Sequence, residues 1–166
     1  DLAAVALAAE QVGGAQRCLD MAVEYAKVRV QFGRPIGSFQ AVKHLCAEMA
    51  VRAEVARASV QAAACVFEDP SAGDPVRAVS GAKVLAGDAA ILNGRQATQV
   101  HGGMGFTWEV DVHLYLKRAW VLDTRFGSAD AHADAIAAAA DGVRRLPRRW
   151  CRSPPGTGEA PDPCER

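Results

Sequence analysis

The sequence has little that would attract a charged or lipid partner. Its 19 basic and 19 acidic residues cancel, so no net field favours nucleic acid or an anionic membrane surface. No apolar run approaches the roughly 20 residues that a helix needs to span a bilayer. The first residues carry no Met and no basic segment, which is expected of a chain cut from a longer protein without a signal peptide. We therefore expect neither nucleic acid nor a membrane as a partner.

Signals for metal and disulfide sites are also scarce. The cysteines are Cys18, Cys46, Cys65, Cys151 and Cys164. Their number is odd and none forms a C-x-x-C pair, so a zinc site is not expected. His101 has no second histidine or carboxylate at ligand spacing, and we predict no metal there either. The first three cysteines fall in helical patterns, where a free thiol behaves as a small apolar residue, and they predict a reducing, cytoplasmic setting.

What the sequence does contain is helical periodicity. Half of the 166 residues are apolar, enough for the core of one domain. Apolar residues recur at spacings of three, four and seven, which is typical of amphipathic helices. The predicted helices span residues 2–31, 39–67, 75–100, 110–123 and 128–145. No stretch alternates like a strand, so the expected fold is an all-α antiparallel helical bundle of about five helices.

Local signals add detail to this bundle. Ser38 is a predicted N-cap of the second helix, and Asp74 followed by Pro75 is the clearest helix start in the chain. Gly13 and Gly14 interrupt the first helix, and we predict a close helix crossing there. The predicted inner residues of the first helix are Val5, Ala9, Val12, Leu19, Val23 and Ala26. The small residues expected to face the core in the third helix are Val79, Ala82, Ala86, Ala89 and Ala97.

The composition changes near the C-terminus. Five of the eight prolines lie in the last 20 residues, mixed with glycine, serine and charged residues. Such a composition cannot bury a core. We predict a helical domain over residues 1–146 and a Pro-rich, disordered tail over 147–166.

Three segments could carry chemistry, and each also has a purely structural interpretation. In residues 29–33 an arginine and an aromatic flank a helix end, where Arg29 could simply complement the helix dipole. In residues 99–106 a glycine cluster could bring backbone N–H groups close to a phosphate, or could be a helix C-cap. Residues 123–130 could be an ordinary helix–turn–helix with Ser128 as N-cap.

The segments occur together in a recognisable order. RVQFGRPI at residues 29–36 is followed by FQA at 39–41, AEM at 47–49 and QVHGGMGF at 99–106. In this combination the chain resembles the acyl-CoA dehydrogenase family, over about residues 1 to 145. The resemblance implies the C-terminal helical domain of a longer FAD-dependent enzyme that oxidises acyl-CoA thioesters to 2-enoyl-CoA, and a fragment that is inactive by itself.

The resemblance also implies cofactor contacts. The positions that match or adjoin the family's FAD contacts are Arg29, Gln31, Phe32, Gln40, Gln99, Gly102, Gly103 and Ser128. Arg29 matches an arginine on the FAD pyrophosphate, and Gln99 and Gly103 match residues at the adenosine end. In the family such residues, Ser128 excepted, reach the FAD of the adjacent subunit, and the position of Ser128 belongs to the chain's own active site. The expected partners are therefore an acyl-CoA substrate and other subunits, in a homo- or hetero-oligomeric dimer or tetramer.

The departures from the family pattern concern the chain's own active site. The family's usual base is a glutamate before Gly-Thr, and here Phe126 stands at that position. Some branches place the base on the first helix, where this chain has Ala3. Neither side chain can accept a proton, so no catalytic residue is identified. Asp130 adds a negative charge where the family often has an uncharged polar residue. The carboxylates Asp123, Glu109 and Asp111 lie off the matched position.

Three functional hypotheses remain open. The first is a base-less subunit that lends FAD contacts to a partner subunit, as occurs in family members acting on bulky acyl chains such as sterol side chains. The second is an active homo-oligomer with a relocated base. The third is a helical interaction module without flavin.

Overall fold

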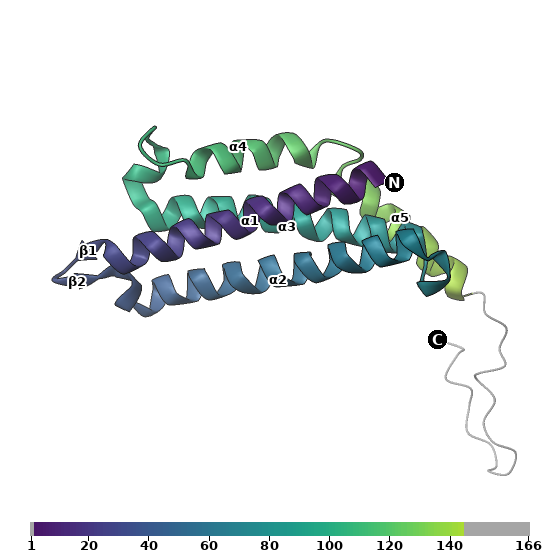
Figure 1. Cartoon of the computed structure of the whole chain (residues 1–166), viewed down its shortest axis with the longest axis horizontal. Coiled ribbons are helices and arrows are strands. Elements are labelled where there is room, and N and C mark those ends of the chain that lie inside the picture. Colours follow the sequence, from purple (N-terminus) through teal and green to yellow (C-terminus); the bar gives the residue numbers. More distant parts are fainter. Residues whose placement is uncertain (1, 145–166) are drawn as a thin grey trace, which may run out of the picture.

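The computed structural model describes residues 2–144, and within them the protein is a helical bundle (Figure 1). The helices are α1 (Leu2–Val28), α2 (Gln40–Glu68), α3 (Pro75–His101), α4 (Val112–Asp123) and α5 (Ala129–Arg144). The long helices α1, α2 and α3 lie side by side, and α4 runs along the opposite side of the pair α1 and α3 from α2 (Figure 1). The predicted all-α bundle of five helices is confirmed. The predicted tail over 147–166 lies outside the described residues.

The core is built largely from small side chains on α1, α2 and α3. The predicted stripe on α3 is buried at every position, with exposed fractions between 0 and 5%. Small residues let helix axes approach closely and interdigitate. No helix within residues 2–144 is both long and apolar enough to cross a bilayer.

The inner face of α1 differs in part from the prediction. Val5, Val12 and Ala26 are buried, but Ala9 is exposed. The buried face runs along Ala4, Val5, Leu7, Ala8, Gln11, Val12, Ala15, Cys18, Ala22 and Ala26. Cys18, Cys46 and Cys65 lie in helices, as predicted, and their burial differs, since Cys18 is buried, Cys46 is half-buried and Cys65 is exposed.

Of the predicted N-caps of α2 and α3, only that of α3 is confirmed. The Asp74 carboxylate accepts hydrogen bonds from the backbone N–H groups two and three residues on, at 2.9 and 3.2 Å. Ser38 is not the N-cap of α2, because residues Ile36–Ser38 form a short 3-10 turn. The N-cap is Phe39, which makes no side-chain capping bond.

A small β-hairpin replaces the predicted last turn of the first helix. α1 ends at Val28, and β1 (Val30–Gln31) pairs antiparallel with β2 (Arg34–Pro35). The turn between them has positive φ at both residues, 52° at Phe32 and 77° at Gly33. Such angles suit a two-residue hairpin turn and are incompatible with continuing a right-handed helix.

The predicted close crossing at the glycine pair is wrong. A Cβ at Gly13 would meet nothing within 4 Å, and one at Gly14 would meet only Tyr115, at 4.0 Å. The close approach lies instead between α3 and α4, where a Cβ at Gly94 would come within 3.1 Å of Leu116. A glycine in the sequence pattern does not reveal which element faces it.

Candidate functional site

A cleft of about 510 Å³ lies at the end of the bundle that carries the β-hairpin (Figure 1). It is lined by Tyr25, Arg29, Gln31, Ile36, Val100, His101, Gly102, Gly103, Met104 and Thr107. These residues come from the end of α1, the hairpin, and the junction of α3 with the 3-10 turn Gly102–Phe106. The fold thus brings together four of the predicted cofactor contacts, namely Arg29, Gln31, Gly102 and Gly103.

Arg29 is fixed by its backbone while its side chain is exposed. Its N–H donates to the Tyr25 carbonyl at 2.9 Å, and its carbonyl accepts from the Ile36 N–H at 2.8 Å. No carboxylate lies within 4 Å of its guanidinium among the described residues. Arg29 lines the cleft, so its guanidinium is a cation there that an anionic ligand can pair with.

The glycine cluster is both a helix cap and an open backbone. Gly102 has φ +62°, and its N–H donates to the Gln99 carbonyl, so the C-cap interpretation is confirmed. A Cβ at Gly102 or Gly103 would meet nothing within 4 Å. By contrast, Gly105 packs against the backbone of Thr98, whose oxygen lies 2.7 Å from the Cβ position. The first two glycines therefore leave room for a ligand to approach the main chain.

Two aromatic rings form the back of the cleft. The rings of Tyr25 and His101 are stacked, with centroids 4.4 Å apart and planes at 22°. The Tyr25 hydroxyl lies 3.6 Å from the Met104 sulfur, and His101 Nδ1 lies 2.8 Å from the Ala97 carbonyl oxygen. Sequence reasoning missed Tyr25. Its place one helical turn before Arg29 was the available signal, since residues four apart share a helix face.

The remaining predicted residues at this end of the bundle do not line the cleft. Phe32 is 91% exposed at the hairpin tip, and its ring meets the Phe39 ring edge-on at 6.1 Å between centroids. Gln40 is exposed at the first position of α2, and Gln99 is exposed in the last turn of α3. All three stay available to a molecule larger than the cleft.

Ser128 lies at the other end of the bundle. It precedes α5, far from the hairpin (Figure 1). Its Oγ accepts a hydrogen bond from the Ala131 N–H at 3.3 Å, as the N-cap interpretation predicted. The start of α1, with Ala3, is at this same end of the bundle (Figure 1).

The loop between α4 and α5 holds Phe126 in an uncommon conformation. Phe126 has φ 57°, its side chain is 61% exposed, and its carbonyl accepts a hydrogen bond from His132 Nε2 at 2.9 Å. Gly127 follows with φ 104°, and a Cβ there would lie 2.9 Å from the same nitrogen. This loop presents an apolar ring to the exterior.

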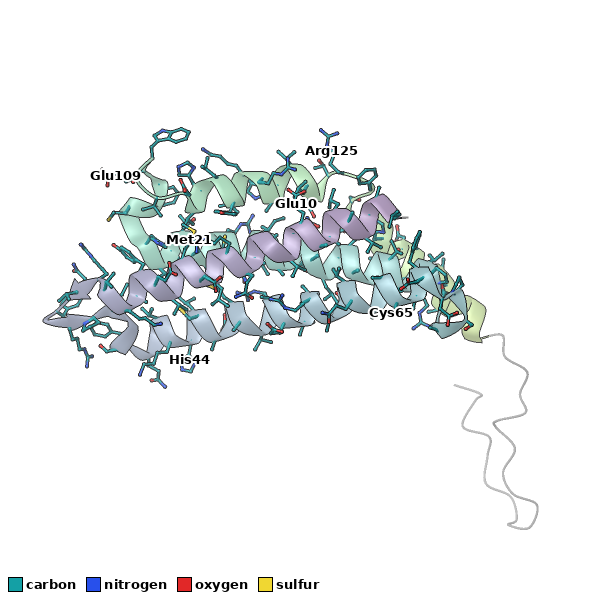
Figure 2. All side chains as sticks on the ribbon, in the orientation of Figure 1. Glu10, Met21, His44, Cys65, Glu109 and Arg125 are labelled. Atoms are coloured by element: carbon teal, nitrogen blue, oxygen red, sulfur yellow. The ribbon has the colours of Figure 1, made fainter. Side chains whose placement is uncertain are left out.

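The three carboxylates that lie off the position of Phe126 in the sequence do not gather at this loop. The Asp123 carboxylate points towards α3, because its Oδ1 lies 2.8 Å from where a Gly87 Cβ would stand. Glu109 lies at the opposite end of α4 from Arg125, the residue before Phe126 (Figure 2). Asp111 directly precedes α4 at that distant end.

Asp123 belongs instead to a buried polar contact with Lys83. The Lys83 ammonium donates to the Asp123 carbonyl oxygen at 3.1 Å, and the lysine is 1% exposed. Burial lowers the pKa of Lys83, while the negative charge of Asp123 opposes that shift. The contact fixes the end of α4 against α3 and has no role in the cleft.

The sequence was compared with those of known proteins. A sequence model of the family described as "Acyl-CoA dehydrogenase, C-terminal domain" matches residues 1–140. A curated relative, the acyl-CoA dehydrogenase FadE34 of Mycobacterium tuberculosis, is 48% identical over 146 residues, which are 87% of this chain and 20% of FadE34.

Solved structures agree with this match. A variant of the steroid ACAD Tcur3481-Tcur3483 superposes with a TM-score of 0.80 and 32% identity, over 87% of this chain and 40% of that one. PigA with FAD and proline superposes with a TM-score of 0.79 and 30% identity, over 86% and 36%. The chain thus spans well under half of the proteins to which it is similar.

Proposed function

This chain belongs to the acyl-CoA dehydrogenase family, as its C-terminal helical domain, and from that premise we propose that it supplies part of an FAD site at a subunit interface. Members of the family are oxidoreductases that use FAD and act on acyl-CoA. The flavin, when bound, supplies the electron acceptor for α,β-dehydrogenation of a thioester. The part that this domain takes in that reaction is to bind and orient.

The observation that carries the proposal is the composition of one cleft. Arg29 offers a cation without a carboxylate partner among the described residues, and Gly102 and Gly103 leave the main chain open beside it. A phosphate-bearing nucleotide needs these two features, a fixed cation and closely approachable backbone. Gln31, in the same cleft, adds an amide that both donates and accepts. The residues present therefore fit the pyrophosphate half of FAD, and Phe32, Gln40 and Gln99 extend that contact surface.

We place this chain in a mixed assembly as the subunit without a base. Phe126 and Ala3 occupy the two positions where the family carries its carboxylate, and Asp123 points into the bundle. Proton abstraction next to the thioester carbonyl then falls to a glutamate of the partner subunit. The name Tcur3481-Tcur3483 joins two designations in one steroid ACAD, which supports a mixed assembly and a bulky, sterol-like acyl chain.

Two other functions would give different activity or flavin content in the purified protein. A homo-oligomer with a base elsewhere in the longer protein would be active without a second kind of subunit. A flavin-free interaction module would purify without colour in every assembly. In the flavin-free module Ser128, at the far end from the cleft, would serve only as the cap of α5. The cytoplasmic location remains a prediction.

Replacing Arg29 tests the proposal. In the full-length protein, assembled with its partner, Arg29→Gln removes the charged contact and lowers FAD affinity by about 10- to 100-fold, the range for one hydrogen bond to a charged group. Arg17→Gln is the matched control, since Arg17 is exposed on α1, the helix that ends just before Arg29, but does not line the cleft. Equal flavin affinity in both variants and the parent, by fluorescence titration of the apoprotein, would contradict the proposal.

A further inference from the structure

We propose that His101 is a specificity-determining residue of the cleft, whose Nε2 atom accepts a hydrogen bond from a ribose hydroxyl of the bound nucleotide. This inference rests on the proposed function, because it takes a nucleotide as the occupant. His101 would accept a hydrogen bond from the ligand, whereas Arg29 would pair with the negative charge of its phosphates.

The hydrogen bond of the other ring nitrogen sets the tautomer. Nδ1 lies 2.8 Å from the carbonyl oxygen of Ala97, one helical turn earlier. A carbonyl oxygen only accepts, so Nδ1 must carry the proton and donate. In the neutral ring Nε2 then has a free lone pair and acts as an acceptor.

The direction of that lone pair is fixed before any ligand binds. The His101 ring is stacked on Tyr25 at 4.4 Å, and the Tyr25 hydroxyl is itself engaged with the Met104 sulfur at 3.6 Å. The stack holds the plane of the ring, and the bond to Ala97 holds its rotation. An acceptor fixed in this way loses little conformational entropy when it binds.

Nε2 is unpartnered yet within reach of the cleft. His101 lines the cleft although it is only 6% exposed. No described residue donates to Nε2, and among the described side chains only Gln11 has fully buried polar atoms without a partner. A ligand that covers Nε2 without donating to it would leave this acceptor desolvated and unpaired, which is unfavourable. The site therefore selects for a donor at this point.

The position of His101 in the chain indicates which donor. It directly precedes Gly102 and Gly103, and consecutive Cα atoms are only about 3.8 Å apart. Since His101, both glycines and Arg29 line one cleft, a group that meets Nε2 would lie near the phosphates that the glycines and Arg29 hold. In a nucleotide the ribose hydroxyls are close to the phosphate, whereas the amino group of adenine is farther away. Gln31 can also accept, but it is exposed on the hairpin, while His101 is held on both sides.

Cofactor analogues test the contact directly. The probes are FAD and its analogues with 2′-deoxyadenosine or 3′-deoxyadenosine, titrated into the apo-assembly by fluorescence. We expect the parent to bind FAD about three- to tenfold more tightly than one of the two analogues, the range for one neutral hydrogen bond. His101→Phe keeps an aromatic ring on Tyr25 but has no Nε2. In this variant the ratio of the affinity for FAD to that for the analogue should fall to about one. The variant should bind the affected analogue at least as tightly as the parent does, because no acceptor is then left unpaired.

The outcomes separate this inference from the proposed function. If Arg29→Gln weakens FAD while the analogue preference is equal in the parent and in His101→Phe, the inference fails and the proposed function stands. If the parent shows no preference at all, the inference fails without any variant, even where His101→Phe does not fold. Desulfo-CoA, an unreactive form of coenzyme A, also carries an adenosine ribose and could therefore occupy the same cleft in place of FAD. A loss of desulfo-CoA affinity in His101→Phe with FAD affinity unchanged would overturn the assignment to FAD.

Discussion

The Nε2 atom of His132 lies 2.9 Å from the carbonyl oxygen of Phe126 and donates to it, since a carbonyl only accepts. The other nitrogen of the same ring lies 3.1 Å from the Ser80 hydroxyl on α3. His132 thus connects the α4–α5 loop to the core of the bundle. The loop that carries Phe126 is therefore held in a defined conformation in this chain.

Replacing Phe126 should leave catalysis unchanged. The ring is 61% exposed and cannot accept a proton, so in Phe126→Ala we expect dehydrogenase activity of the assembled protein within about twofold of the parent. The backbone bond to His132 does not depend on the ring and remains. Steady-state kinetics with an acyl-CoA substrate measure this. A loss of more than tenfold at unchanged flavin content would mean that the ring belongs to a working active site.

Two glycines of α3 should respond in opposite ways to alanine. A Cβ at Gly94 would stand 3.1 Å from Leu116, so Gly94→Ala overpacks the contact with α4 and should destabilise the fold by about 1–3 kcal/mol. A Cβ at Gly81 would meet nothing within 4 Å, so Gly81→Ala should stabilise the same helix by about 1 kcal/mol. Urea unfolding of both variants measures the difference. Equal changes in the two would show that helix propensity alone governs these positions.

Cys18 should make stability fall at alkaline pH. Burial raises the pKa of its thiol from 9.0 to about 12, so between these values the folded state keeps a proton that the unfolded state releases. The stabilisation is fully present below pH 9 and is lost as the pH rises, by at most about 1.4 kcal/mol per pH unit.

The measurement is urea unfolding at pH 8 and pH 10, in the parent and in Cys18→Ala. The alanine variant should lack this part of the pH dependence. Cys65→Ala is the matched control, because Cys65 is exposed on α2 and should keep the slope of the parent. Identical slopes in all three proteins would show that the Cys18 thiol is not shielded.

Much of this fold follows from periodicity alone. The apolar stripe of α3 and the Asp74 cap were predicted because both depend on neighbours within one helix. The hairpin at Val30–Pro35 was not, since strands of two residues show no alternation to detect. The contact of Gly94 was missed because it depends on α4, which a local pattern does not include.

In the cleft, too, local motifs were predicted from the sequence while contacts between helices were not. Arg29 and the glycines were found from motif order, and the fold brings them together. The stack of Tyr25 on His101 joins two helices that are distant in the chain, so no local signal pairs them. The sequence therefore indicates several of the residues that line the cleft, while the packing of α1 on α3 determines which of their atoms are held in place.

The most direct test of the account is the flavin absorbance and dehydrogenase activity of the full-length protein, purified alone and then co-purified with a family subunit that carries the base glutamate. The account predicts that flavin and activity appear only in the mixed assembly. Flavin and full activity from the protein alone would contradict it, because a carboxylate outside the positions of Phe126 and Ala3 would then abstract the proton.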